Sequence, residues 1–122
     1  MTHQRAWIGI DLDGTLAQYE HWTDGSIGEP IMPMIDLVKT LLSENLYKVK
    51  IFTARVSPAS RPAAEAIEQR SRIEDWCVQH LGQVLDITHE KDSSMVLMYD
   101  DRCVQVEKNT GRLLSPGVNL GS

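Results

Sequence analysis

The sequence predicts an α/β fold, a Rossmann-like three-layer sandwich built around a mainly parallel β-sheet. Short apolar, β-branched runs alternate along the chain with longer amphipathic segments, which is the pattern of layered α/β domains. The chain has 122 residues, of which 42% are hydrophobic, and this length and composition suit a single core. Because no internal repeat or low-complexity block divides the chain, we expect one domain over residues 1–122.

The first half of the chain predicts a strand, a loop, a helix and a second strand. Ala6 to Ile10 is apolar enough for a buried strand, and a polar, glycine-bearing loop from Gln18 to Pro30 follows. Pro33 opens the helix, since proline is tolerated in a first helical turn. Lys48 to Phe52 is the second predicted strand. The helix carries apolar residues on one face: Ile35, Val38, Leu41, Leu42 and Leu46.

The second half adds a long helix, from Ala63 to Leu81, and two further strands. Gly82 stands where a helix commonly ends. Val84 to Thr88 is predicted as the third strand, and the nearly all-apolar run Met95 to Tyr99 as a fourth, buried on both faces. The predicted inner face of the helix comprises Ile67, Ile73, Trp76, Cys77 and Leu81. The remaining segments are a candidate edge strand, Cys103 to Val106, and an irregular tail, residues 109–122.

Composition and charge argue against several classes of protein. The net charge of -5 and a pI near 5.3 disfavour broad binding to nucleic acid or to an anionic membrane. Cys77 and Cys103 lie far apart without neighbouring ligand residues, so neither a disulfide framework nor a zinc site is indicated. No apolar run reaches membrane-spanning length, and the polar start lacks a signal-peptide core. We therefore expect a soluble, cytoplasmic protein with no membrane partner.

Two aspartates follow the first predicted strand. The run Ile8-Gly-Ile-Asp-Leu-Asp-Gly-Thr15 places Asp11 and Asp13 two positions apart, and such residues of a strand point the same way. Two carboxylates this close repel each other unless a cation or a shared proton relieves the repulsion. A metal-assisted phosphoryl-transfer site uses this arrangement. The alternative is an acidic turn after a strand, because Asp-Gly is a common turn dipeptide.

Polar side chains also follow the other predicted strands. In open parallel sheets, ligands bind outside the carboxyl ends of the strands. Each residue has a plain structural alternative: Thr53 can cap a turn, Arg55 can pair with a surface carboxylate, and Lys91 can be solvated. Their conjunction at the strand ends is what predicts a site. The residues in question are Thr53 and Arg55 after the second strand, His89 and Lys91 after the third, and Asp100 and Asp101 after the fourth.

Four segments, in this order, resemble the motifs of the haloacid dehalogenase superfamily of phosphohydrolases. Asp11-Leu-Asp-Gly-Thr-Leu16 is similar to the first motif, and Ile51-Phe-Thr53 to the second. Lys91 fits the third, and Val96-Leu-Met-Tyr-Asp100-Asp101 resembles the fourth. The first and last motifs are the specific ones. More closely, the chain resembles the small members without a cap domain that phages and bacteria encode.

The resemblance implies a magnesium-dependent phosphomonoester hydrolase. Asp11 would be the nucleophile and form an aspartyl-phosphate intermediate. Asp13 would protonate the leaving oxygen and then activate water. Mg²⁺ would be held by the Asp11 carboxylate, the Asp13 backbone carbonyl and Asp100, with Asp101 in or just behind the coordination sphere.

The resemblance also assigns phosphate-binding groups. Thr53 and Lys91 would hold the phosphoryl oxygens, and Gly14 would let the backbone turn tightly below the phosphate. The connection from Lys91 to the fourth strand is short, so His89 and Arg55 are alternatives to Lys91 for this task.

The segments in which this superfamily inserts cap domains are short here. Ala17 to Pro30 supplies at most a flap, and the second insertion site is shorter still. The implied site is open to a phosphorylated small molecule or a macromolecular end, or is covered by a partner subunit through oligomerisation. Trp22 or His21 is the expected contact from the flap, with Arg55 and Arg61 facing it.

Two other functions stay open. Arg55, Arg61 and Arg102 favour a phosphatase that acts on nucleotides or nucleic-acid ends, whereas the acidic net charge speaks against it. A non-catalytic phosphate-binding domain, haloacid dehalogenase-like or receiver-like, also places acidic residues and a lysine at strand ends. In a receiver the acid pair and the phosphorylated aspartate lie on different strands, so the run from Asp11 to Thr15 favours the phosphatase.

Overall fold

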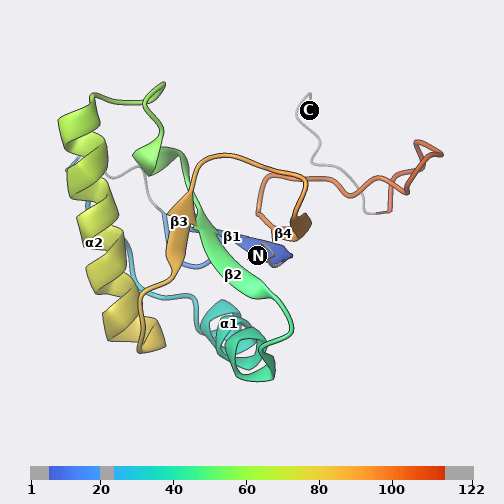
Figure 1. Cartoon of the computed structure of the whole chain (residues 1–122), viewed down its shortest axis with the longest axis horizontal. Coiled ribbons are helices and arrows are strands. Elements are labelled where there is room, and N and C mark those ends of the chain that lie inside the picture. The colour runs from blue at the N-terminus through green and yellow to red at the C-terminus, as the bar shows by residue number, and fades with distance from the viewer. Residues whose placement is uncertain (1–5, 20–23, 115–122) are drawn as a thin grey trace, which may run out of the picture.

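The computed structural model describes residues 6–19 and 24–114, and in them four strands form one parallel sheet beside two α-helices (Figure 1). The strand order is β3-β2-β1-β4, and each neighbouring pair is parallel. The predicted α/β class with a parallel sheet is confirmed. In chain order the elements are β1 (Trp7–Asp11), α1 (Met32–Glu44), β2 (Lys48–Phe52), the 3₁₀ turn η1 (Ala54–Val56), α2 (Ala63–Leu81), β3 (Asp86–Thr88) and β4 (Met95–Tyr99).

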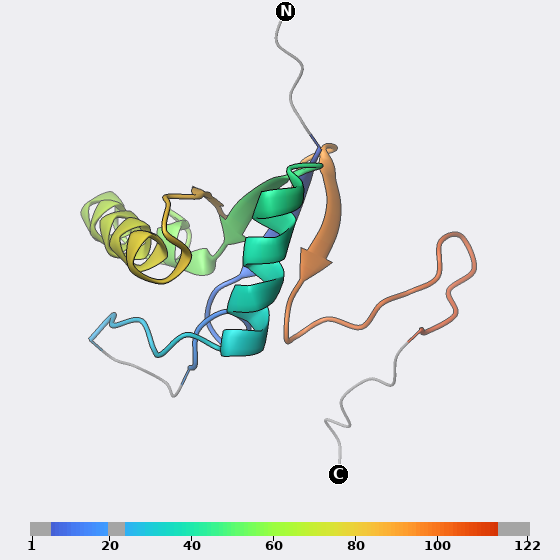
Figure 2. The ribbon, with the colours of Figure 1, turned by 90° about the horizontal axis from the view of Figure 1, so that it is seen from below.

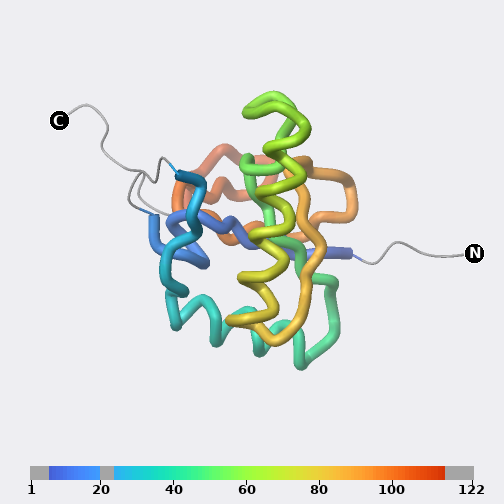
Figure 3. Tube along the Cα trace, turned by 90° about the vertical axis from the view of Figure 1, so that its left-hand side faces the viewer, coloured from blue at the N-terminus to red at the C-terminus, as the bar shows by residue number. Residues whose placement is uncertain are grey.

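Both helices pack on the same face of the sheet. Ile8 and Ile10 of β1 alternate with residues of the opposite face, and they share one core with buried residues of both helices. α1 crosses near the C-terminal end of α2, as Figures 2 and 3 show from two further directions. The core residues that the helices contribute are Ile35 and Val38 from α1, and Ile73, Trp76, Cys77 and Leu81 from α2.

The opposite face of the sheet is centred on Trp7, which is fully buried. A Cβ on Gly9 would lie 2.7 Å from the Met98 sulfur and 3.1 Å from the Trp7 ring, so the absence of a side chain makes room for both. The Trp7 indole Nε1 donates a 2.8 Å hydrogen bond to Asp92, in the connection from β3 to β4. The Lys50 ammonium lies 4.6 Å from the Trp7 ring centroid. Among the described residues no helix covers this face, so the third layer of the predicted sandwich is not seen in that part of the chain.

The helix ends follow their capping residues. Asn45 and Gly82 adopt left-handed backbone conformations, with φ of 53° and 81°, and their N–H groups bond back to the last turns of α1 and α2. Two predicted core residues are exposed, which corrects the sequence prediction: Leu46 is 71% exposed and Ile67 is 70% exposed. Leu46 lies beyond the end of α1. On α2 the buried stripe begins at Gln69, on the side of the helix away from Ile67.

The structure also corrects the predictions for the fourth strand and for residues 103–106. β4 is an edge strand within the described residues, so Val96 and Leu97 are 51% and 43% exposed instead of buried on both faces. A register irregularity between β1 and β4 accompanies this exposure. Residues 103–106 form no sheet strand: Val106 makes an isolated bridge with Leu113, because this segment pairs with the chain just after it.

In the described ranges, neither helix combines the length and apolar character that crossing a bilayer requires.

Candidate functional site

The site lies where the strand order of the sheet reverses. From β1 the chain continues to β2 on one side, while β4 pairs on the other side. In open α/β sheets a crevice forms outside the carboxyl ends of the strands at such a switch point. Asp11 is the last residue of β1, and Asp100 and Asp101 directly follow β4. Asp11 therefore meets Asp100 and Asp101 at this crevice, although almost 90 residues separate them in the sequence.

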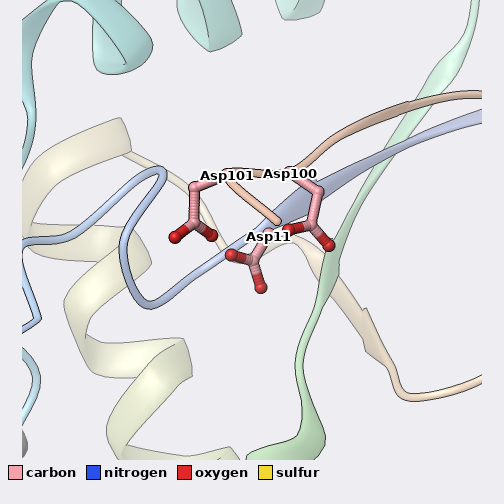
Figure 4. A group of neighbouring side chains, drawn as sticks. All are labelled: Asp11, Asp100 and Asp101. Carbon is pink, nitrogen blue, oxygen red and sulfur yellow. The ribbon is translucent and has the colours of Figure 1, made fainter. Parts of the chain in front are cut away.

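Three carboxylates converge there: Asp11, Asp100 and Asp101 each offer an oxygen, and these oxygens lie within 4.8 Å of one another (Figure 4). Carboxylate oxygens are the ligands that hard divalent cations such as Mg²⁺ prefer. The donor set therefore fits the metal that the sequence predicts. Asp13 is outside this group of three, and the predicted metal contact of its backbone carbonyl stays a prediction.

The pKa of Asp11 is raised from 3.8 to about 7. Burial is the largest cause, followed by a hydrogen bond with the Asp101 carboxyl and by the negative charge of Asp100, while a hydrogen bond from Thr15 opposes the shift. A metal-free site therefore tends to hold a proton on Asp11. A cation among these carboxylates would relieve the repulsion that retains this proton.

Gly14 and Thr15 form the turn after β1, next to the acidic group, by which we mean Asp11, Asp100 and Asp101. Gly14 has φ of +89°, and a Cβ there would lie 2.6 Å from an Asp101 carboxylate oxygen, so both backbone and space require glycine. The Thr15 hydroxyl is 3.1 Å from Asp11 Oδ2 and accepts the Asp101 N–H at 3.0 Å. Thr15 thus ties the end of β1 to the end of β4. The sequence assigned no task to Thr15, and it related Gly14 to phosphate instead of to Asp101.

Asp13 forms a separate, bidentate ion pair with Arg55. Arg55 donates from Nε to Asp13 Oδ2 at 2.7 Å and from Nη2 to Oδ1 at 2.8 Å, and the two side chains are only 9% and 22% exposed. The remaining donors of Arg55 bond to the Gly25 carbonyl at 2.7 Å, the Ser26 carbonyl at 2.8 Å and Gln69 Oε1 at 2.9 Å. All five N–H groups of this guanidinium are therefore used within the protein.

This network fixes four segments of the chain to one another. Arg55 stands on η1, Asp13 in the turn after β1, Gln69 on α2, and the carbonyls of residues 25 and 26 belong to the loop before α1. Trp76 of α2 also donates to the Gly28 carbonyl at 3.1 Å, so this loop is held along α2. Arg55 reaches a phosphate only by exchanging one of these bonds, and its phosphate-binding task stays a prediction.

A cavity of about 420 Å³ opens over the acidic group. Thr53 lines it and accepts the Arg55 backbone N–H at 3.1 Å, which confirms the turn-capping alternative and leaves its hydroxyl proton to donate. The predicted site residues in the lining are Asp11, Asp13, Thr53, Arg55, Asp100 and Asp101. The further lining residues include Tyr19, Ser60, Arg61 and Arg102, of which the sequence named only the two arginines: both for the nucleotide or nucleic-acid alternative, and Arg61 also as facing the flap.

Lys91 is exposed in the β3–β4 connection and is not part of the cavity lining. Its neighbour Asp92 is held by Trp7 and by the Ser94 N–H at 2.8 Å. The phosphate-binding task of Lys91 stays a prediction, as does that of its alternative His89. The expected flap contacts, His21 and Trp22, lie outside the described residues.

Comparison with protein-family models, curated proteins and solved structures found no match to this chain.

The raised pKa of Asp11 predicts that the metal-free protein loses stability as pH rises. In the unfolded chain this carboxyl ionises near 3.8, whereas in the folded protein it keeps its proton up to about 7. The folded state binds more protons between these values, so the stability that this group contributes is greatest below pH 3.8 and is lost as pH rises through about 7.

Thermal melts in EDTA from about pH 5 to about pH 8 measure this loss. The wild-type melting temperature should fall across the interval relative to that of Asp11→Asn, in which this titration is absent, and millimolar Mg²⁺ should reverse the fall. Parallel curves for the two proteins would contradict the assignment.

Proposed function

We propose that this protein is a Mg²⁺-dependent phosphomonoester hydrolase that works through an aspartyl-phosphate on Asp11. The observation that carries the proposal is the group of three carboxylates at the switch point of a parallel sheet, next to a fourth carboxylate, Asp13, that an arginine holds. Bringing Asp11 next to a pair of aspartates almost 90 residues later costs free energy through charge repulsion and burial. An ordinary polar turn gives no compensation for this cost, whereas a functional site does.

In the proposed reaction Asp11 is the nucleophile and Asp13 transfers the protons. An Asp11 oxygen attacks phosphorus, and the bond from phosphorus to the ester oxygen breaks. Asp13 first takes up a proton and then gives it to the ester oxygen that leaves. Water then attacks phosphorus, Asp13 takes its proton, and the bond to Asp11 breaks to release inorganic phosphate. Arg55 uses one lone pair of each Asp13 oxygen, which leaves a second lone pair on each for this proton transfer.

Mg²⁺ bound by Asp11, Asp100 and Asp101 would neutralise charge on the transferred phosphoryl group. The Thr53 hydroxyl supports the same charge by donating a hydrogen bond from the cavity wall. Thr15 and Gly14 keep Asp11 and Asp101 in place.

Membership of the haloacid dehalogenase superfamily, with its three-layer Rossmann-like fold, is part of this proposal. The order β3-β2-β1-β4 supports it, because the Rossmann sheet has the same order around its switch point. A third layer would have to come from outside the described residues. The rival receiver-like domain is disfavoured because Asp11 and Asp13 belong to the same strand end.

The test is hydrolysis of p-nitrophenyl phosphate with Mg²⁺ and with EDTA. We expect turnover with Mg²⁺, loss in EDTA and recovery when Mg²⁺ is restored. Acid quenching with a ³²P-labelled phosphomonoester should leave protein-bound label that hydroxylamine releases, as an acyl phosphate requires. Mg²⁺ binding that stabilises the protein without any turnover across a panel of phosphomonoesters would favour the non-catalytic, phosphate-binding alternative.

A further inference from the structure

The charges around the cavity do not balance within the protein. Four aspartates and three arginines line it. Arg55 and Asp13 neutralise each other in their ion pair. Asp11, Asp100 and Asp101 form the candidate metal site. Arg61 and Arg102 remain, and no salt bridge within residues 6–19 and 24–114 includes either of them.

Arg61 carries the clearer signal. Its Nε is buried and, within the part of the chain that the structure describes, is the buried side-chain nitrogen or oxygen that lacks a hydrogen-bond partner. Buried polar groups are nearly always paired in native proteins, because burial removes the water that would otherwise accept from them. Arg61 also lines the cavity, so an anion that enters the cavity could pair with its guanidinium, for which the described residues provide no acidic partner.

The residue that follows Arg61 restricts its backbone. Arg61 stands in a short loop between Pro58 and Pro62, and Pro62 directly precedes α2. Proline fixes its own φ and also restricts the residue before it, here Arg61 itself. The Arg102 side chain is exposed at the cavity, and its backbone is held by the N–H that donates to Asp100 Oδ1 at 2.8 Å, in the turn that carries the metal-site carboxylates.

From these contacts we infer that Arg61 and Arg102 bind a second anionic group of the substrate, so that the substrate carries another phosphate or phosphodiester beside the phosphate that is removed. This inference rests on the proposed function and names its substrate class. Guanidinium groups bind phosphate oxygens with charge-assisted, often bidentate hydrogen bonds. A cavity of about 420 Å³ also exceeds what one phosphate requires and falls within the roughly 300–1,000 Å³ typical of sites for larger ligands.

Two sources can supply this chemistry, a bisphosphorylated small molecule and the phosphorylated end of an oligonucleotide. The probes are thymidine 3′,5′-bisphosphate, the two thymidine monophosphates, and dithymidine dinucleotides phosphorylated at the 5′ or the 3′ end. We expect kcat/KM for the bisphosphate or for a phosphorylated dinucleotide to exceed that for the monophosphates by about 10-fold or more. The better of the two substrates identifies the source.

The decisive variants are Arg61→Met and Arg102→Met, which remove the charge and keep much of the side-chain length. Each should lower kcat/KM for the preferred substrate by about 10-fold to 100-fold, and for p-nitrophenyl phosphate by less than about threefold. Arg112→Met is the matched control, because this exposed arginine pairs with Glu107 away from the cavity. It makes the same change in net charge and should alter neither value. Arg61→Lys should recover part of the lost kcat/KM, since lysine restores the positive charge but not the bidentate hydrogen bonding of the guanidinium.

Equal losses on p-nitrophenyl phosphate and on the preferred substrate would overturn the inference, because Arg61 would then serve the reacting phosphate or the fold. Equal kcat/KM for monophosphates and doubly charged substrates would overturn it as well. If no substrate is turned over, the proposed function fails, and calorimetry still tests the inference. The Asp11→Asn protein should bind thymidine 3′,5′-bisphosphate at least about 10-fold more tightly than either monophosphate, and Arg61→Met should remove the difference.

Discussion

Asp11→Asn is expected to lower kcat for phosphomonoesters by about 10³-fold or more, because an amide cannot replace the carboxylate nucleophile. The same substitution should raise the melting temperature in EDTA near pH 8. It removes one of the three crowded carboxylates, and with it the charge whose burial and repulsion raise the pKa of Asp11 to about 7. Loss of activity with a gain in metal-free stability is the signature of a functional carboxylate and not of a structural one.

Steady-state assays and thermal melts of the purified variant measure both effects. Asp75→Asn on the exposed side of α2 is the matched control, since it makes the same chemical change at a distance from the acidic group. It should leave turnover unchanged. Near-normal turnover by Asp11→Asn would remove Asp11 from the nucleophile role, and a lower melting temperature in EDTA would show that its carboxylate stabilises the fold.

The sheet was predictable because its signals are local. β2 and β4 begin and end at the predicted residues, and α2 runs from Ala63 to Leu81 as expected, with Gly82 as its left-handed cap. Burial in the helices and the edge strand was less predictable. Ile67 fits the helical period roughly but not the side of α2 that faces the core, and which side faces the core depends on tertiary packing. Likewise an apolar run such as β4 does not indicate that the strand lies at an edge.

The acidic group was predictable for a topological reason. Parallel strands bring their carboxyl ends to one edge, so Asp11 had to approach Asp100 and Asp101 once β1 and β4 were neighbours. The partner of Arg55 was not predictable in this way. Its bond to Asp13 joins residues 42 apart in the sequence, and its other bonds go to loop carbonyls, which any residue type supplies. The sequence therefore predicted Arg55 as a phosphate ligand, with a surface carboxylate as the alternative partner, whereas the observed partner is the largely buried Asp13.

Arg55→Met is expected to destabilise the protein by about 3–5 kcal/mol, the usual cost of removing one partner of a buried ion pair. The substitution leaves the Asp13 carboxylate, largely shielded from water, without its two donors. It also leaves the carbonyls of Gly25 and Ser26 and the Gln69 amide oxygen without the Arg55 bonds. Urea titration should show a fall of about 1–5 M in the midpoint with little change in slope.

Three further variants separate the ion pair from other effects of the substitution. Arg72→Met is the matched control: Arg72 also bonds to the same loop, at the Asp24 carbonyl, but it is exposed, so its loss should cost about 0.5 kcal/mol or less. Arg55→Lys keeps the charge without the fork and should lie between wild type and Arg55→Met. Adding Asp13→Asn to Arg55→Met should recover stability, because the unpaired charge is then gone. A wild-type urea midpoint for Arg55→Met would mean that the Arg55 network contributes nothing to the stability of the fold.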